Sequence, residues 1–160
     1  MTTARIVLKQ VADPTLCATA RELFLEYAEM IGTDLEYQGF SAELHALPGP
    51  YKPPFGALLV ALIDEEVAGC VAMRPLDDHA AEMKRLYVRP AYRSFGLGQR
   101  LVESVIEASR AAGYRELRLD TLASMSAAQG LYQRLGFVEI PPYNTRHLPG
   151  TRFYSLPLAA

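Results

Sequence analysis

Three apolar segments lie close together between Ala57 and Val88, and this feature restricts the fold more than any other part of the sequence. Residues 57–63 and 67–75 are separated only by acidic residues, and residues 82–88 follow after a short connection. Connections of this length join antiparallel strands but are too short for the crossover that parallel neighbours require. The sequence therefore predicts a run of antiparallel strands, ended by Pro90.

Helical and strand-like patterns alternate in the rest of the chain. The periodicity predicts helices over residues 14–31, 97–113 and 124–135, with a short helical patch inside the proline-rich segment 39–56. Further strands are predicted over residues 5–11, 116–122, 137–140 and 151–156. The expected fold class is therefore α/β (α+β mixed), with one central mixed, mostly antiparallel sheet flanked by helices. We expect a single domain over residues 1–160, because the loop-rich segment continues directly into folded sequence on both sides.

Composition excludes several classes of protein. The 160 residues are 50% apolar and 21% charged, which suits one globular core. The 16 Lys and Arg residues are scattered among 18 Asp and Glu residues and leave a formal charge of -2. A protein of this charge has no general electrostatic footprint for nucleic acid, so no nucleic-acid partner is expected.

No membrane segment or leader is expected either. The longest uncharged apolar run, Phe55–Ile63, is far shorter than the roughly 20 residues of a membrane-spanning helix. The start of the chain has no apolar stretch typical of a secretory signal. Cys17 and Cys70 have no CxxC spacing and the histidines are scattered, which indicates neither a disulfide framework nor a metal site. We therefore expect a cytoplasmic protein that binds no metal.

The segment RSFGLGQ, residues 93–99, places two glycines where the helix over residues 97–113 begins. Glycine in a helical turn costs about 1 kcal/mol relative to alanine, so another requirement must select it. The first amides of a helix lack acceptors inside the helix, and the helix dipole makes this end positive, so it can hold a phosphate. Gly96 and Gly98 would let phosphate oxygens approach these amides, and Arg93 adds a positive charge. A tight turn is the structural alternative, mainly for Gly98.

Two nucleotide-binding motifs do not match this segment. A P-loop has Lys followed by Ser or Thr at the helix start, where this chain has Gln99 and Arg100. A dinucleotide fingerprint has a third glycine three residues after Gly98, where this chain has Leu101.

The same residues resemble a known family. Arg93-x-x-Gly96-x-Gly98, directly after a strand that ends Leu86-Tyr87-Val88, resembles the acyl-coenzyme A motif of the GNAT acetyltransferase superfamily. LYQRLGFVE at 131–139 is similar to the second motif of that family, and the ordered pair of motifs is far more specific than a lone GxG. The resemblance covers the whole chain, because the predicted element order is the GNAT order. MKRLYVRPAYR, RLDTLASM and GTRFYSL resemble a branch of small bacterial-type members with mostly unassigned acceptors.

The resemblance implies an N-acetyltransferase that passes acetyl from acetyl-CoA directly to a primary amine of a small molecule or peptide, and it makes a homodimer an option. An acyl-CoA-binding module with little or no catalysis is the alternative, and a longer donor such as succinyl-CoA stays open. The cofactor-binding residues carried over by the motif are Leu86, Tyr87, Val88, Arg93, Ser94, Phe95, Gly96, Leu97, Gly98, Gln99 and Ala128.

Acetyl transfer to an amine needs a general base and a general acid near neutral pH, because free amines have a pKa of about 10.4 and thiols of about 8.5. The resemblance implies Glu82 as base, provided that burial raises its pKa, and Tyr132 as the acid that protonates the leaving sulfur. A salt bridge with Lys84 or Arg85 on a solvated strand end is the structural alternative for Glu82. Packing in the core is the alternative for Tyr132.

This sequence departs from the family pattern in two places. Met125 stands where the family often has an asparagine, which removes one polar contact to the pantetheine arm. Ser94 and Phe95 replace the small or basic residues that commonly follow the motif arginine, so phosphate binding is expected to depend more on backbone amides.

Other residues give weaker candidates. A covalent route through Cys70 is disfavoured because cysteines in strands are usually buried and inert. His79 is an alternative base, and His147 is a candidate for the edge of the acceptor pocket. The acceptor side is expected to be acidic and aromatic and to suit a cationic amine. The residues that give it this character are Asp34, Glu36, Tyr37, Glu43 and Tyr51.

Overall fold

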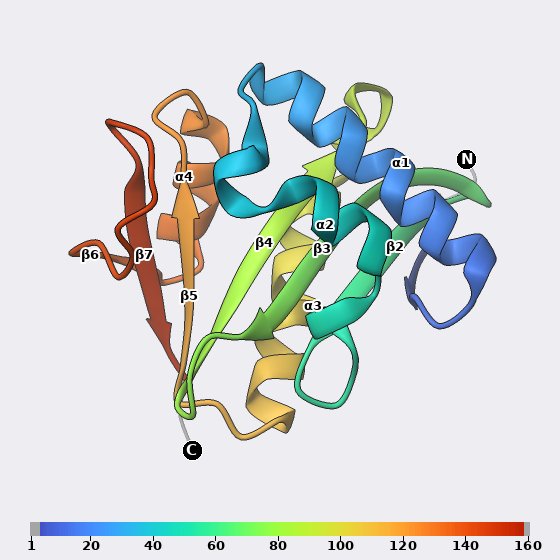
Figure 1. Cartoon of the computed structure of the whole chain (residues 1–160). Coiled ribbons are helices and arrows are strands. Elements are labelled where there is room, and N and C mark those ends of the chain that lie inside the picture. The colour runs from blue at the N-terminus through green and yellow to red at the C-terminus, as the bar shows by residue number, and fades with distance from the viewer. Residues whose placement is uncertain (1–3, 159–160) are drawn as a thin grey trace.

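The computed structural model describes residues 4–158 and contains one seven-stranded sheet (Figure 1). Its strands are β1 (Ile6–Gln10), β2 (Ala57–Ile63), β3 (Glu66–Pro75), β4 (Ala80–Val88), β5 (Glu116–Thr121), β6 (Val138–Ile140) and β7 (Arg152–Pro157). Its helices are α1 (Pro14–Ile31), α2 (Phe40–Ala46), α3 (Leu97–Ala111) and α4 (Ser126–Arg134), with short 3-10 helices η1 (Leu35–Gln38), η2 (Gly49–Tyr51) and η3 (Pro90–Phe95).

The strand order is β1-β2-β3-β4-β5-β7-β6, and β4 with β5 is the one parallel pair within the described residues. The predicted fold class is therefore confirmed. The predicted domain also includes residues 1–3 and 159–160, which lie outside the described part of the chain, and its extent stays a prediction. None of the helices among residues 4–158 is long and apolar enough to cross a bilayer.

The central strands form the predicted antiparallel run. The β2–β3 connection turns at Asp64 and Glu65, which both have positive φ values (48° and 73°), the backbone geometry of a tight hairpin turn. β4 begins at Ala80, two residues earlier than predicted. Glu82 therefore does not open the strand but lies inside it, where 1% of its surface is exposed.

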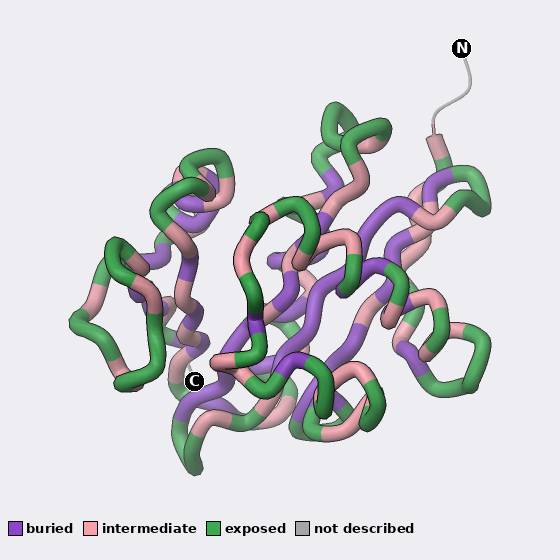
Figure 2. The backbone as a smooth tube through the Cα atoms, turned by 45° about the horizontal axis from the view of Figure 1, so that its top comes forward, coloured by how far each residue is buried: buried purple, intermediate pink, exposed green. Residues whose placement is uncertain are grey.

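Helices cover both faces of the sheet (Figure 1). α1 begins as predicted, because the Asp13 side chain accepts a hydrogen bond from the Leu16 amide at 2.8 Å and Pro14 starts the helix. α1 and α2 pack on one face through a buried cluster that includes Leu23, Phe24 and Phe40. α3 and α4 pack on the other face through a second cluster. Figure 2 shows the strands between these layers as the most buried part of the chain.

β4 and β5 separate along their length, and this separation positions the site. Their pairing comprises Ala80 with Glu116, Ala81 with Leu117 and Glu82 with Arg118. Beyond Glu82, β4 contains a bulge at Arg85, whose φ is 61°, and the register with β3 shifts there. Figure 1 shows the two strands close at their starts and apart at their arrowheads. The β5-facing main chain of β4 after Glu82 therefore has no strand partner.

The start of α3 differs from the prediction in one detail. Gly96 does not lie in the first helical turn but caps the helix, with a left-handed φ of 71°, and Leu97 is the first helical residue. A residue with a side chain is strained in this conformation, so the backbone itself requires glycine at 96. α3 ends at Ala111, two residues before the predicted end.

Candidate active site

A cavity of about 490 Å³ opens where β4 and β5 have separated, and we call it the β4–α4 cavity. One wall is the free edge of β4, and the other is the segment that leads into α4. Six of the predicted cofactor-binding residues line it: Leu86, Tyr87, Val88, Arg93, Gly98 and Ala128. Met125 lines it as well, at the position where the family often has an asparagine.

The other predicted cofactor-binding residues do not line this cavity with their side chains. Ser94 and Phe95 are exposed in η3, and Leu97 is buried in the core beneath α3. The first hydrogen bond of the helix runs from the Arg100 amide to the Gly96 carbonyl at 3.3 Å. The amides before Arg100 therefore have no acceptor within the helix, and main-chain groups are what residues 97–99 can offer a ligand.

Gly98 has a different explanation from Gly96. Its backbone is helical, and a Cβ added there would lie 3.6 Å from Leu131 Cδ2, an ordinary contact. Neither conformation nor packing therefore requires glycine at 98, although it weakens the helix. Because Gly98 lines the β4–α4 cavity, close approach of a ligand is the remaining physical reason for it. Arg93 stands at the same end, fixed by a hydrogen bond from its Nε to the Val88 carbonyl at 2.9 Å.

A second cavity, of about 560 Å³, lies beside α2, and we call it the α2 cavity. Residues from η1 to η2 form one wall, and the inner strands with the β6–β7 connection form the other. Its lining residues are Tyr37, Gln38, Gly39, Ala42, Glu43, Ala46, Leu47, Pro48, Pro50, Tyr51, Arg74, Glu82, Lys84, Asp120, Asn144 and Arg146.

Glu82 lines the α2 cavity, but both of its oxygens are already bonded. Oε1 accepts from Arg74 Nε at 2.9 Å and pairs with Arg74 Nη2 at 2.8 Å, and Oε2 accepts from the Tyr143 hydroxyl at 2.6 Å. Burial acts to raise the pKa of Glu82, but Lys84, Tyr143 and Arg74 outweigh it, and the pKa lies below its ordinary value. The condition for Glu82 as base, a raised pKa, is therefore not met. Glu82 does form the salt bridge of the structural alternative, but the partner is Arg74 rather than Lys84 or Arg85, and Glu82 is buried rather than at a solvated strand end.

Asp120 and Lys84 face each other across the start of the gap, and sequence reasoning missed both as site residues. Glu82 on β4 pairs with Arg118 on β5. Lys84 and Asp120 each lie two residues further along these parallel strands, so they come opposite each other. Burial raises the pKa of Asp120, with Lys84 acting in the opposite direction. Asp120 takes part in none of the ion pairs within the described residues, and a side-chain hydrogen bond from Asn144 acts to lower its pKa. Alternate residues of a strand face the same side, so the position of Lys84 two residues after Glu82 could have indicated that it lies on the same face.

A small cavity of about 20 Å³ shares lining residues with both larger ones, and we call it the junction cavity. Leu86 and Met125 line both the junction and the β4–α4 cavity. Lys84 and Asp120 line both the junction and the α2 cavity. Tyr132 also lines the junction, while its ring packs at 5.7 Å from Phe137 and 6.2 Å from Tyr154, measured between centroids. Burial raises the pKa of Tyr132, so its hydroxyl keeps its proton.

Comparison with known proteins bears on what these cavities hold. Residues 19–137 match the model of the acetyltransferase (GNAT) family. This chain belongs to the GNAT acetyltransferase family. As a member it is an acyl-CoA-dependent N-acyltransferase by class. An uncharacterised N-acetyltransferase of Schizosaccharomyces pombe is 35% identical to it over 161 residues, which cover 99% of each chain.

Solved structures share the fold of this GNAT protein. A GNAT acetyltransferase of Staphylococcus aureus superposes with a TM-score of 0.81 at 22% identity, over 97% of this chain and 100% of that one. A putative acetyltransferase of Salmonella typhimurium, solved with its cofactor acetyl-CoA, gives a TM-score of 0.67 at 19% identity, over 98% and 95% of the two chains.

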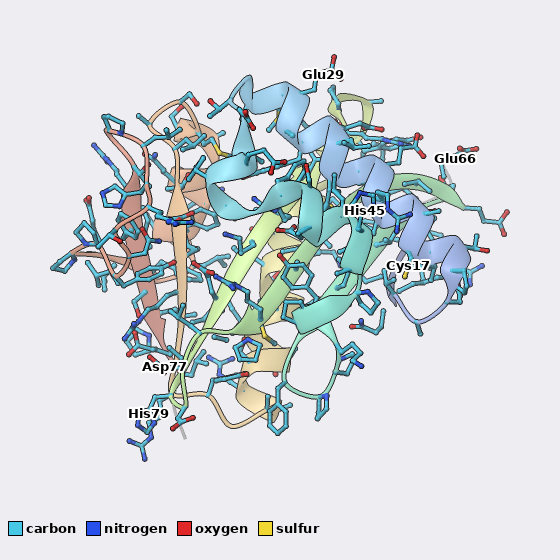
Figure 3. All side chains as sticks on the ribbon, in the orientation of Figure 1. Cys17, Glu29, His45, Glu66, Asp77 and His79 are labelled. Carbon is cyan, nitrogen blue, oxygen red and sulfur yellow. The ribbon has the colours of Figure 1, made fainter. Side chains whose placement is uncertain are left out.

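Several weaker candidates of the sequence lie outside the cavities of this GNAT protein. His79 lies in the turn before β4, where its amide bonds the Asp77 side chain at 2.7 Å, at the edge of the molecule (Figure 3). It lines neither large cavity. His147 is exposed and packs on Phe153, and its neighbours Asn144 and Arg146 line the α2 cavity in its place.

Of the three acidic residues predicted for the acceptor side, only Glu43 lines the α2 cavity. Asp34 caps η1 through the Glu36 amide, and Glu36 itself bonds Ser41, so neither carboxylate lines the α2 cavity. Glu43 does line it, but Arg85 holds both of its oxygens, at 2.8 and 2.9 Å. The two predicted aromatic residues, Tyr37 and Tyr51, both line the cavity.

Proposed function

We propose that this protein transfers an acetyl group from acetyl-CoA directly to a primary amine. The observation that carries the proposal is the junction between the two large cavities. A donor in the β4–α4 cavity and an amine in the α2 cavity would meet beside Asp120 and Tyr132, within one small space. Such an arrangement brings the reacting groups together and so lowers the entropic part of the barrier.

The residues of the β4–α4 cavity fit acetyl-CoA, which when bound supplies the activated thioester. The free edge of β4 from Leu86 to Val88 offers main-chain groups to the pantetheine arm, and the amides of residues 97–99 with Arg93 suit the diphosphate. Gly98 leaves these amides open. The cysteines offer no covalent route, because Cys70 is fully buried and neither Cys17 nor Cys70 lines the cavities.

Tyr132 is the candidate acid because it lines the junction cavity and carries a protonated hydroxyl at neutral pH, although burial, which raises its pKa, makes it a weaker acid. The sequence indicated Glu82 as base, but Asp120 meets the requirements better. Asp120 lines the junction, whereas Glu82 lines only the α2 cavity, and Asp120 has no ion-pair partner in the described part of the chain. Its partly buried carboxylate can accept a proton from the amine as the nitrogen attacks.

The experiment is thiol release from acetyl-CoA with a panel of primary amines, with the acetylated product identified by mass. We expect amine-dependent release and a stoichiometric N-acetyl product. Calorimetry with acetyl-CoA separates the alternative function. Tight acetyl-CoA binding without thiol release for any amine would support a binding module and contradict the proposed transfer.

A further inference from the structure

The charges that line the α2 cavity do not balance within the protein. Six charged side chains line it: Glu43, Arg74, Glu82, Lys84, Asp120 and Arg146. Two ion pairs satisfy three of them, because Arg74 pairs with Glu82 at 2.8 Å and Glu43 pairs with the buried Arg85 at 2.8 Å. What remains is one carboxylate, Asp120, and two cations, Lys84 and Arg146.

Lys84 and Arg146 have spare hydrogen-bond donors. Neither takes part in any ion pair among residues 4–158. Lys84 Nζ donates to Gln38 Oε1 at 3.3 Å, but that oxygen also accepts from Arg85 Nη1 at 2.8 Å. An ammonium can donate three hydrogen bonds, so most of the capacity of Lys84 is free. Lys84 is partly buried and loses part of its hydration, so an anionic ligand would stabilise its ammonium, while Arg146 is exposed and lines the same cavity.

These charges select the acceptor. An amine with no other charge would place a further positive group beside two cations. A carboxylate on the same molecule offsets the charge of that amine and supplies a counter-charge for the two cations. Resting on the proposed function, we propose that the acetyl acceptor is a free amino acid, with its amino group beside Asp120 and its carboxylate beside Lys84 and Arg146.

The opposite wall of the α2 cavity indicates what the rest of the acceptor is like. Ala42, Ala46, Leu47 and Pro50 line that wall, together with the ring of Tyr51. This wall offers hydrocarbon to a ligand and suits an apolar side chain. A protein lysine side chain carries no carboxylate near its amine, so it would leave the two cations unpaired.

The test compares acceptors that differ in one group. Phenylalanine, phenylalaninamide and phenethylamine, and the matching leucine series, are assayed at saturating acetyl-CoA by thiol release. We expect kcat/KM for the free amino acid to exceed that of the amide and the amine by about tenfold or more, from the lost charge-assisted bonds. The ammonium group of the amide has a lower pKa than that of the amino acid, so more of the amide is present as the reactive free amine. This difference favours the amide and therefore works against the expected result. An amide or amine that reacts as well as the amino acid would overturn the proposal.

The substitution Arg146→Gln tests whether Arg146 binds the carboxylate of the acceptor. We expect it to lower kcat/KM for phenylalanine by about tenfold while changing that for phenethylamine little, so that the preference collapses. Arg115→Gln is the matched control, because Arg115 is exposed at the start of β5, lines neither large cavity and should leave the preference intact. An unchanged preference in Arg146→Gln contradicts the assignment.

Binding separates failure of this inference from failure of the proposed function. Phenylalanine and phenethylamine are titrated calorimetrically into the protein saturated with CoA. If amines are acetylated with no preference for a carboxylate, the proposed transferase activity is supported and the proposal of an amino-acid acceptor is contradicted. Tighter binding of phenylalanine with no turnover supports the acceptor class and contradicts the transfer. Equal or absent binding together with no turnover contradicts both.

Discussion

At the scale of single residues, the two carboxylates of the α2 cavity differ in what already binds them. Glu82 is held by Arg74 and Tyr143, and its pKa is lowered, so it stabilises this part of the sheet as an anion. Asp120 has no ion-pair partner within residues 4–158 and a raised pKa, so it can exchange a proton. The sequence alone does not show which of the two carboxylates is structural and which can act as a base. The ion pair and hydrogen bonds of Glu82 make this distinction.

Asp120→Asn should therefore affect chemistry, and Glu82→Gln should affect stability. We expect Asp120→Asn to lower kcat by roughly 10² to 10⁴, the usual contribution of a general base, with acetyl-CoA affinity unchanged. In the wild type, activity should be lost as the pH falls through the raised pKa of Asp120, and the variant should lack this step. A pH profile of kcat checks it. A variant with wild-type kcat would remove Asp120 from the mechanism.

Glu82→Gln should lower the free energy of unfolding by about 1 to 3 kcal/mol, less than a fully buried pair because Arg74 is 39% exposed. Since the pKa of Glu82 is lowered in the folded state, its ion pair stabilises the protein above the ordinary glutamate pKa. This contribution is lost as the pH falls through the lowered pKa. Urea unfolding at several pH values should show a smaller acid-side loss of stability in the variant. An unchanged pH dependence would contradict this role.

Tyr132→Phe should lower kcat by about 100-fold, because the leaving thiolate loses its proton donor. Tyr154→Phe is the matched control, since the Tyr154 hydroxyl is buried without a hydrogen-bond partner and its ring lies 6.2 Å from that of Tyr132. Removing an unbonded hydroxyl should leave kcat and stability nearly unchanged. Equal effects of the two substitutions would show that Tyr132 matters through packing alone.

At the scale of elements, the start of α3 combines two glycines with separate reasons. Gly98→Ala meets only an ordinary contact with Leu131, so it should raise the free energy of unfolding by up to about 1 kcal/mol while weakening CoA binding. Gly96→Ala should instead destabilise the protein by about 1 kcal/mol through its left-handed backbone. Thermal unfolding and CoA calorimetry check both. Unchanged CoA affinity in Gly98→Ala would mean that the helix start does not hold the diphosphate.

α2 is attached to the sheet by a buried ion pair. Arg85 is 3% exposed and bonds both oxygens of Glu43. Glu43→Gln leaves this guanidinium without its counter-charge and should cost about 3 to 5 kcal/mol in denaturant unfolding. Glu107→Gln breaks the exposed pair with Arg110 and should cost less than about 0.5 kcal/mol. Similar losses in the two variants would contradict the structural role of the Arg85–Glu43 pair.

At the scale of the whole molecule, patterns along the chain predicted the fold, and six of the residues predicted to bind the cofactor line one cavity. The periodicity of apolar residues and the short connections predicted the order of helices and strands. Gly98 and Arg93 lie within one short segment, so the sequence could indicate them together as cavity-lining residues. The charges of the α2 cavity depend on contacts between distant residues, such as Arg74 with Glu82, Arg85 with Glu43 and Tyr143 with Glu82. No local sequence pattern shows which charged side chains form ion pairs. The prediction of an acidic surface therefore included Glu43, whose charge is neutralised by Arg85 in the structure.

The central claim is that donor and acceptor occupy the two cavities at once and meet at the junction. Initial rates measured over a grid of acetyl-CoA and acceptor concentrations test it most directly. Occupation of both cavities before transfer predicts double-reciprocal lines that intersect, with one acetylated amine formed for each thiol released. Parallel lines, which indicate that CoA leaves an acetylated protein before the amine binds, would contradict it.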